Sequence, residues 1–301
     1  MLVALKGAGP ESRQVSMPEL PEVEVLVRHL RPLIQNRTIR GVQVRRAKVV
    51  APTSPAKLKR VLTDATFTGL SRRGKYLLFE LRRRGRRDVV SLVGHLGMTG
   101  RIYLARRGAE LPKHAAIVLD LGRENLIFED TRYFGRFTLD TSMLANLGPE
   151  PLSDCFTSGH LDEALARSSQ AIKVKLLDQS LLAGVGNIYA SEALFRAKIS
   201  PRLAAHRLTV DQIRRLRRAI RAILAEAIRF GSTVPLNHGR DGNRDGLFYF
   251  GRAADALDYY AERLRVYDRA GQPCERCGSA IKRIVQAARS TFYCPKCQGG
   301  G

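Results

Sequence analysis

The chain has 301 residues, a length that favours two domains with a small appended module. Lysine and arginine number 51 against 28 aspartate and glutamate, so the formal net charge is +23 and nucleic acid is the first partner to consider. No apolar run reaches the roughly 18 residues of a membrane-spanning helix, and residues 1–16 hold no signal-peptide core of about 7–15 apolar residues, so we expect a soluble cytoplasmic protein with no membrane partner.

Residues 21–34 carry apolar side chains at helical spacing, and acidic residues lie at their start. Glu19, Glu22 and Glu24 fall in the first turns, where the positive end of the helix dipole favours carboxylates. The pattern predicts one amphipathic helix that opens the first domain.

Between residues 41 and 140 the pattern changes to short β-type runs separated by turns. These runs are 76–81, 89–93, 117–121, 126–129 and 136–139. They predict a β-sandwich or a β-barrel. The stretch 147–152 is too rich in glycine and proline to continue a helix or a strand, so we place the domain boundary there, after residue 150.

Helical periodicity returns in the second half of the chain, at 161–166, 172–179, 188–197 and 210–230. Thr209 and Gln212 form the capping box of the last helix. Its polar face carries five arginines, which we interpret as a solvated face rather than a DNA contact: Arg214, Arg215, Arg217, Arg218 and Arg221. Residues 236–261 lack periodicity and are expected to form a long loop.

Four of the five cysteines form two pairs near the end of the chain, Cys274 with Cys277 and Cys294 with Cys297, sixteen residues apart. This spacing is typical of a structural zinc site, because two such turns direct four thiolates at one metal and leave no open position. The residues between the pairs are basic, which favours a β-hairpin finger on DNA over a protein-binding zinc ribbon. We expect Cys155 to be a small buried apolar residue without a function.

Several motifs, in this order, resemble those of the formamidopyrimidine-DNA glycosylase family. They are MPELPEVE at 17–24, RGKY at 73–76, HLGMTG at 95–100, DTRYFG at 130–135, the stretch 147–152, AGVGNIYASE at 183–192 and the finger. The resemblance covers nearly the whole chain from Met17 onward. It implies an α+β multidomain protein: an N-terminal β-sandwich with a leading helix over 17–150, a helix–two-turn–helix domain with a lesion-capping loop over 151–261, and a C-terminal β-hairpin zinc finger over 262–301.

The resemblance implies a base-excision repair glycosylase and abasic-site lyase that removes oxidised purines, 8-oxoguanine and formamidopyrimidines, from double-stranded DNA. The secondary amine of an N-terminal Pro18 attacks the sugar C1′, and the Schiff base leads to β- and δ-elimination. An α-amino group titrates at about 7.7–8.0 and is a usable nucleophile. Glu19 is the expected proton carrier, Lys75 belongs to the catalytic set, and Glu22 has a supporting role. The alternative interpretation of Glu19 is a carboxylate stabilised at a helix N-terminus.

Phosphate contacts are implied for Lys75, His95, Asn187 and Arg289, the last at the tip of the finger, and Lys173 falls near the lesion. Such contacts fix the register of the DNA without reading its sequence. Taken singly, Lys75 could be a solvated lysine at a strand end and His95 a satisfied core histidine. The glycines before Asn187 match the backbone turn of the helix–two-turn–helix motif.

Met98, Arg132 and Phe134 match the three family residues that fill the gap left by the extruded nucleotide. Extrusion costs a few kcal/mol of stacking and pairing. Met98 is the apolar probe, Arg132 the fork that pairs with the orphaned cytosine, and Phe134 the aromatic wedge. The alternative is that Met98 and Phe134 are ordinary core residues.

Two departures from the family pattern bear on function. Residues 1–16 precede the family's start, and an internal proline nitrogen is an amide that cannot form an iminium, so we expect a mis-assigned start with Met17 removed. Residues 236–261 are longer than the family's usual connection, which affects lesion preference.

Three other functions stay open at this point. One is an endonuclease VIII-like glycosylase for oxidised pyrimidines, whose opening motif has glycine in place of Leu20. The others are a DNA-binding relative without catalysis, if Pro18 is not N-terminal, and a zinc-ribbon protein of RNA or ribosome assembly. The favoured interpretation is a monomer with one structural zinc that acts on damaged double-stranded DNA. We expect it in the cytoplasm, associated with the nucleoid.

Overall fold

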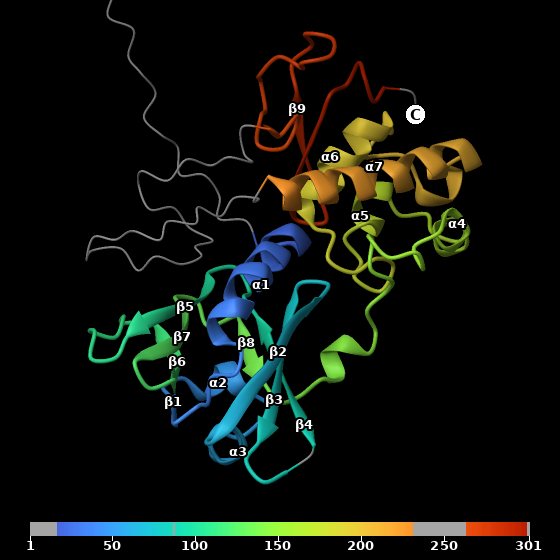
Figure 1. Cartoon of the computed structure of the whole chain (residues 1–301). Coiled ribbons are helices and arrows are strands. Elements are labelled where there is room, and N and C mark those ends of the chain that lie inside the picture. Colours follow the sequence, from blue (N-terminus) through green and yellow to red (C-terminus); the bar gives the residue numbers. More distant parts are fainter. Residues whose placement is uncertain (1–16, 87, 231–262, 300–301) are drawn as a thin grey trace, which may run out of the picture.

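A computed structural model describes residues 17–86, 88–230 and 263–299 (Figure 1). The expected extension 1–16 and the expected loop 236–261 lie outside these ranges. Figure 1 shows a β-rich domain joined to a helical domain, with helix α1 between them and the finger hairpin on the far side of the helical domain. No helix within the described ranges combines the length and the apolar character needed to cross a membrane.

Helix α1 (Leu20–Ile34) is the predicted opening helix and begins one residue earlier than expected. Its apolar positions, among them Val23, Leu26 and Leu30, are fully buried against the sandwich. Pro21 lies in the first turn, where its missing N–H removes no helical hydrogen bond. The helix therefore has a fixed start, and this start faces the helical domain.

The β-rich domain consists of two four-stranded antiparallel sheets, so the structure decides for a sandwich over a barrel. The first sheet has the order β1 (Gly41–Val44), β6 (Ala115–Asp120), β7 (Glu124–Asp130) and β5 (Gly100–Arg106). The second has the order β2 (Ala65–Arg73), β3 (Tyr76–Arg83), β4 (Val89–His95) and β8 (Arg136–Thr138). Phe128 of β7 stacks on Phe137 of β8 at 5.7 Å between ring centroids, which joins the two sheets in one core.

Three strands and two short helices were not predicted from the sequence. They are β1, β2, β5, α2 (Ala47–Val50) and α3 (Pro55–Leu62). In β2 the strand pattern is interrupted because a bulge between Phe67 and Gly69 shifts the register by one residue. The period of two residues is lost there, although the strand continues.

The short helix η1 (Ser142–Leu144) lies just before the domain boundary. Within the described residues the helical domain contains five helices joined by tight turns: α4 (Ser158–Leu165), α5 (Ile172–Lys175), α6 (Asn187–Ala197), η2 (Ala205–Arg207) and α7 (Val210–Arg229). Helix α5 is shorter than predicted because Asp178 accepts hydrogen bonds from the backbone and hydroxyl of Ser180 and forms a turn instead. The capping box of α7 is confirmed, with Thr209 and Gln212 exchanging hydrogen bonds of 2.9 and 3.2 Å.

The interpretation of the arginines of α7 as a solvated face is wrong for three of the five. Arg217 donates to the carbonyl of Phe156 at 2.5 Å. Arg221 donates to two carbonyls of the domain boundary, and Arg215 reaches a carbonyl at the end of α6. Their long side chains satisfy backbone acceptors of segments distant in sequence. Arg214 and Arg218 remain exposed, as expected.

The finger consists of β9 (Lys282–Gln286) and β10 (Arg289–Tyr293), an antiparallel hairpin. Ala287 and Ala288 form its two-residue turn with φ of 46° and 58°. The finger packs on α6, because Phe195 shares one small core with Val266 and Phe292. The expectation for Cys155 is wrong: it is exposed, because it lies in a surface turn after the domain boundary.

Candidate active site and DNA interface

The amino end of α1 is buried where the sandwich meets the helical domain. Pro18 is buried, whereas Met17 before it is 38% exposed. The N–H of Leu20 donates to the carbonyl of Gly184 at 3.0 Å. Gly184 has φ of +87°, and a Cβ there would lie 2.7 Å from the side chain of Leu20. The glycine therefore allows the chain start to lie against the turn before α6.

Glu19 extends this contact with its side chain. Its carboxylate accepts hydrogen bonds from the N–H groups of Ile188 at 2.8 Å and Tyr189 at 3.3 Å. These N–H groups belong to the first turn of α6, so the dipole of α6 stabilises Glu19, which is also the N-cap residue of α1. A Cβ on Gly186 would lie 2.3 Å from the Glu19 carboxyl carbon. The carboxylate of Glu19 therefore leaves no room for a side chain at Gly186, the second glycine of the AGVGNIYASE motif.

The pKa of Glu19 is raised above the ordinary value for a glutamate. Burial of the carboxyl is the main cause, and the side chain is only 2% exposed. The positive charge of Lys75, the two N–H donors of α6 and the charge of Lys173 act in the opposite direction. A carboxyl with a raised pKa next to Pro18 is suited to act as a general acid.

Glu22 lies beside Glu19 and is also buried, at 3% exposure. It accepts hydrogen bonds from the backbone N–H of Glu19 at 2.9 Å and from the hydroxyl of Tyr189 at 2.5 Å. Burial, followed by the charge of Glu19, raises the pKa of Glu22 to about 7. Tyr189 therefore holds both carboxylates, one through its backbone and one through its hydroxyl. The sequence reasoning missed Tyr189, although the residue lies inside the AGVGNIYASE motif.

Lys75 lies in the turn between β2 and β3, and ion pairs hold this turn against the domain boundary. Gly74 donates its N–H to Glu150 at 2.6 Å, and Arg73 donates to Glu150 and to two carbonyls of the boundary segment. Arg72 pairs with Glu150 at 2.7 Å and with Glu24 of α1 at 2.9 Å. The turn is thereby fixed relative to both domains.

The structure brings Lys75 and Lys173 to the same site as Glu19. Burial lowers the pKa of Lys75, and the nearby charge of Glu19 opposes this effect. Lys173 is 1% exposed, and burial lowers its pKa to about 8. The charge of Arg289 lowers the pKa of both lysines, so the finger arginine faces this site as well. Lys75 is not a solvated lysine.

Asn187, the first residue of α6, connects the lysine site to the finger. Its Oδ1 accepts from Nζ of Lys173 at 2.5 Å, and its Nδ2 donates to the carbonyl of Ser290 at 2.9 Å. Ser290 follows Arg289 in β10, and Arg289 is exposed. The side chain of Asn187 therefore has protein partners on both ends, which the sequence did not predict.

A second buried glutamate of α6 fixes the chain that enters the finger. Glu192 is 1% exposed and accepts hydrogen bonds from the N–H groups of Arg265, Val266 and Tyr267 at 2.8 to 3.0 Å. The sequence reasoning assigned no role to Glu192. A single acid among the apolar residues at the centre of α6 was the available signal.

His95 lies at the end of β4, half-buried, with its ring 4.8 Å from that of Tyr76. Its Nδ1 lies 3.1 Å from the N–H of Gly97 and accepts from it. Burial, followed by the charges of Lys75 and Arg136, lowers the pKa of His95 to about 4. The imidazole is therefore neutral and carries its proton on Nε2, for which no hydrogen bond is found within the described residues. His95 is a free neutral donor rather than a satisfied core histidine.

The three residues expected to fill the gap in DNA lie together. Arg132 donates to the sulfur of Met98 at 3.2 Å, and its guanidinium lies 4.7 Å from the ring centroid of Phe134. Phe134 is 49% exposed and Met98 is half-buried. The interpretation of Phe134 as a core residue is therefore wrong.

A buried aspartate that the sequence reasoning missed holds the loops of these three residues. Asp130 has no exposed surface and accepts hydrogen bonds from the hydroxyl of Thr99 at 2.5 Å, the N–H of Arg132 at 3.1 Å and the N–H of Gly135 at 2.7 Å. A Cβ on Gly97 would lie 2.8 Å from the nitrogen of Gly135, so the two loops meet backbone to backbone. Asp130 is the first residue of the DTRYFG motif.

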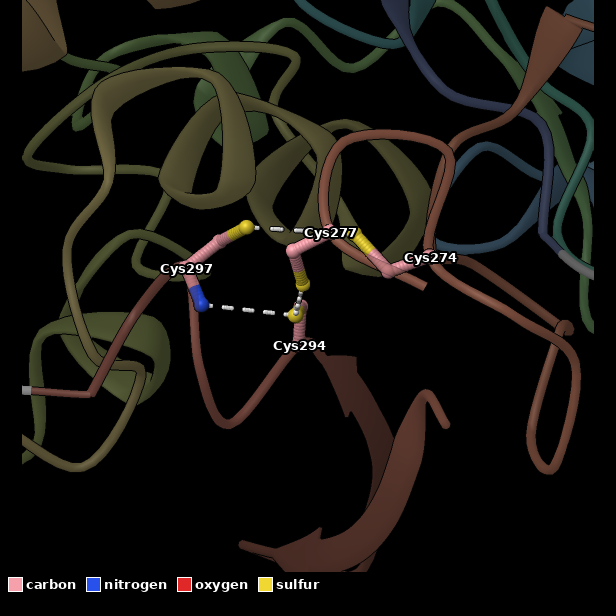
Figure 2. A group of neighbouring side chains, drawn as sticks. All are labelled: Cys274, Cys277, Cys294 and Cys297. Carbon is pink, nitrogen blue, oxygen red and sulfur yellow. Dashed lines mark hydrogen bonds between the residues drawn. The ribbon is translucent and has the colours of Figure 1, made fainter. Parts of the chain in front are cut away.

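The four predicted cysteine ligands meet in the finger, as Figure 2 shows. Their sulfur atoms all lie within 4.8 Å of one another, with 3.9 Å between Cys274 and Cys297 and 3.4 Å between Cys277 and Cys294. A tetrahedral zinc with Zn–S bonds of about 2.3 Å places its sulfur ligands roughly 3.8 Å apart. The donor set and its spacing fit one zinc ion with no open position.

Comparison with known proteins agrees with this geometry. Three family models match the chain: "Formamidopyrimidine-DNA glycosylase N-terminal domain" over residues 17–137, "Formamidopyrimidine-DNA glycosylase H2TH domain" over 147–236, and "Zinc finger found in FPG and IleRS" over 271–299. Formamidopyrimidine-DNA glycosylase from Paracoccus denitrificans is 41% identical, covering 94% of this chain and all of that protein. The enzyme from Chloroflexus aggregans is 43% identical, covering 94% and 98%.

Three similar solved structures are complexes with DNA. Lactococcus lactis Fpg with DNA containing an abasic site superimposes with a TM-score of 0.82 at 34% identity, covering 94% of this chain and all of that one. The same enzyme with N7-benzyl-Fapy-dG DNA gives 0.82 at 35%, with the same coverage. MutM with DNA containing carbocyclic 8-oxo-G gives 0.81 at 34%, again with that coverage.

A sandwich whose leading helix inserts its acidic start into a helix–two-turn–helix domain, followed by a four-cysteine finger, defines a zinc-finger DNA glycosylase. The family models cover most of the chain, and the relatives are matched over nearly their whole length. The chain belongs to the formamidopyrimidine-DNA glycosylase family.

Proposed function

We propose that this protein removes oxidised purines, 8-oxoguanine and formamidopyrimidines, from double-stranded DNA and then cleaves the strand at the abasic site. The observation that carries the proposal is the group formed by the buried Pro18 and Glu19 with the half-buried Lys75, in which a raised-pKa carboxyl lies next to the amine along the chain. Solved relatives bound to Fapy-dG and 8-oxo-G DNA support the choice of oxidised purines over oxidised pyrimidines.

Pro18 is the proposed nucleophile. Its secondary amine forms a bond to C1′ of the damaged nucleotide while the bond from C1′ to the base breaks and the base leaves. The proton lost by the amine passes to the departing base, and opening of the sugar then gives an iminium between Pro18 and C1′. The iminium acidifies the C2′ hydrogen, so the 3′ phosphate and then the 5′ phosphate leave by β- and δ-elimination.

Glu19 supplies the proton that the sugar ring oxygen takes up as the ring opens. Its raised pKa keeps the carboxyl protonated to a higher pH than an exposed glutamate. After transfer, the carboxylate is stabilised by the two N–H donors of α6 and by the charges of Lys75 and Lys173. Glu22 holds the backbone of Glu19 in place.

This chemistry requires Pro18 to be N-terminal, because the nitrogen of an internal proline is part of a planar amide. The match to the family model begins at residue 17. We therefore assign the functional start to Met17, which is removed to free Pro18, and leave residues 1–16 outside the three domains 17–150, 151–261 and 262–301.

DNA binding is proposed for the residues that surround this site. Lys75, Lys173 and Arg289 supply positive charge, and His95 supplies a neutral N–H from Nε2. Asn187 contributes by holding Lys173 and β10 in place.

Met98, Arg132 and Phe134 enter the gap left by the extruded nucleotide, since Arg132 and Phe134 are exposed and the three side chains already touch. One zinc ion stabilises the finger through Cys274, Cys277, Cys294 and Cys297. The enzyme acts as a monomer on chromosomal DNA, which places it with the nucleoid in the cytoplasm.

Borohydride trapping tests the proposal. The protein beginning at Pro18 is incubated with a duplex carrying one 8-oxoguanine, with sodium borohydride present, and the covalent complex is digested to find the linked residue. The expected result is a link at Pro18. A DNA-binding relative without catalysis or an RNA-assembly protein would give no covalent complex. A parallel duplex with an oxidised pyrimidine tests the endonuclease VIII-like alternative.

A further inference from the structure

A polar groove lies on the second sheet, away from the catalytic group. Its lining includes the loop after α1, with Gln35 and Thr38, the β2 residues Thr66 and Thr68, and the hairpin that joins β3 to β4. The cavity has a volume of about 850 Å³. In Figure 1 the turn between β3 and β4 lies at the end of the sandwich opposite the helical domain.

Four arginines give this groove its charge: Arg82, Arg83, Arg84 and Arg86. Within the described ranges none of them forms an ion pair with a carboxylate. Asp64 is the single carboxylate among the described lining residues, and Glu80 lies nearby over Gly69. Like charges placed side by side destabilise a hairpin unless something binds to them.

The remaining lining residues are hydrogen-bonding groups. Strand pairing places Thr66 opposite Arg82, and the hydroxyl of Thr66 lies 2.8 Å from that of Thr38. Thr68 lies at the bulge of β2, and its Oγ1 is buried without a hydrogen-bond partner in the described part of the chain. The hydroxyls of Thr38 and Thr66 therefore add hydrogen-bonding groups beside the arginines of the groove.

The chemistry of the groove selects the class of ligand. Arginine forks together with threonine, asparagine and glutamine side chains are the groups that proteins use to bind phosphodiester oxygens. No aromatic side chain is present among the described lining residues, so none of them can stack on a nucleobase through an aromatic ring. The groove suits a nucleic-acid backbone bound without regard to sequence, rather than a free nucleotide.

The groove is separate from the catalytic site. Strand β3 has Tyr76, next to Lys75, at one end and Arg83 at the other, and seven steps of about 3.3 Å separate them by about 23 Å. The Debye length at physiological ionic strength is about 8 Å, so the two sites are screened from each other. A duplex held at the catalytic group leaves the arginines of the groove available.

We infer that this groove is a second DNA-binding site, which holds the phosphate backbone of another DNA segment while the catalytic site is occupied. Two DNA sites on one protein allow transfer from one segment to another without full release into solution. The inference requires a DNA-binding protein but not the Pro18 chemistry, so undamaged DNA tests it independently of the glycosylase activity.

The test uses the zinc-loaded protein beginning at Pro18 and compares wild type, R82A/R84A/R86A and the matched control R167A/R214A/R218A. The three control arginines are also exposed and lie in the helical domain. An immobilised undamaged duplex is saturated with protein and then offered a second, labelled duplex. Dissociation from the first duplex is followed as a function of competitor DNA, and thermal melting of each variant confirms folding.

Wild type and the control variant are expected to capture the second duplex and to dissociate several-fold faster as competitor DNA rises. The groove variant is expected to lose both effects, and the salt slope of its DNA binding is expected to fall by about 2–3 at roughly 0.9 per lost phosphate contact. Excision from a short lesion duplex should stay unchanged.

Capture by the groove variant equal to that of wild type, or an equal loss in the control, overturns the inference. Displacement from the groove by polyglutamate but not by DNA also overturns it and assigns the surface to an acidic protein.

Discussion

The carboxylate of Glu19 accepts a hydrogen bond of 2.8 Å from the backbone N–H of Ile188, a residue 169 positions away in the sequence. This contact joins the start of the sandwich domain to the first turn of α6 in the helical domain. The proposed catalytic group is therefore assembled only when the two domains pack against each other.

Substitution of Gly186 by alanine should inactivate the enzyme without unfolding it. A Cβ at this position would lie 2.3 Å from the carboxyl carbon of Glu19 and would displace it from α6. We expect single-turnover excision to fall by roughly 100-fold, because a displacement of about 1 Å in a catalytic group has that effect. Gly159→Ala is the matched control, since its Cβ would approach only the Thr157 hydroxyl, at 3.8 Å. Equal activity of Gly186→Ala and wild type would contradict the role given to Glu19.

The free energy of unfolding should change with pH because Glu22 has a raised pKa in the folded protein. The folded pKa of Glu22, about 7, lies above its ordinary value of 4.5. A raised folded pKa contributes stability that is present below the unfolded pKa and is lost as pH rises through the folded pKa. The free energy of unfolding of wild type should therefore fall by up to roughly 3 kcal/mol because of this group between about pH 4.5 and pH 7. Thermal midpoints of Glu22→Gln and wild type at pH 5 and pH 8 measure it, and the variant should gain relative stability at pH 8. A difference that does not change with pH would refute the assigned shift.

Arg132→Ala should reduce discrimination for the base opposite the lesion, because the guanidinium is exposed beside Met98 and Phe134. A lost bidentate contact removes about 1–3 kcal/mol of discrimination. Lys75→Ala, by contrast, should weaken binding to every DNA. Excision rates from duplexes with cytosine and with adenine opposite 8-oxoguanine give the ratio. If Arg132→Ala leaves that ratio at the wild-type value, another residue reads the base.

Removal of zinc should abolish DNA binding while the sandwich stays folded. Zinc binding stabilises small modules by about 10–16 kcal/mol, and the finger core has few apolar residues besides Val266, Ile281 and Phe292. Elemental analysis before and after chelation, with circular dichroism and binding of an abasic duplex, measures the effect. Active protein purified without zinc would disprove the assignment.

The finger turn should be stabilised by an Asn-Gly pair in place of Ala287 and Ala288. Both alanines have left-handed backbone angles, which cost an L-residue roughly 1–2 kcal/mol each, and Asn-Gly is the preferred pair for such turns. The double variant should release zinc at a higher denaturant concentration than wild type. Ala288→Val should release zinc at a lower denaturant concentration than wild type. Equal midpoints for all three proteins would count against strain in the turn.

The sequence alone determined the features that depend on neighbouring residues. The period of residues 21–34, the capping box of Thr209 and Gln212 and the spacing of the four cysteines each follow from interactions within a few residues or from a fixed ligand geometry. The motif resemblance also identified the residues that meet at the site. Local pattern was enough because helix periodicity, capping and thiolate spacing act over short stretches of chain.

Only the tertiary structure decided which groups are buried and what they contact. Glu19 is stabilised by the helix dipole of α6, Asp130 holds two loops, and Arg217 binds a distant carbonyl, whereas Cys155 is exposed. The raised pKa values follow from the same packing, because desolvation depends on segments far apart in sequence that cover the group. No local pattern contains that information.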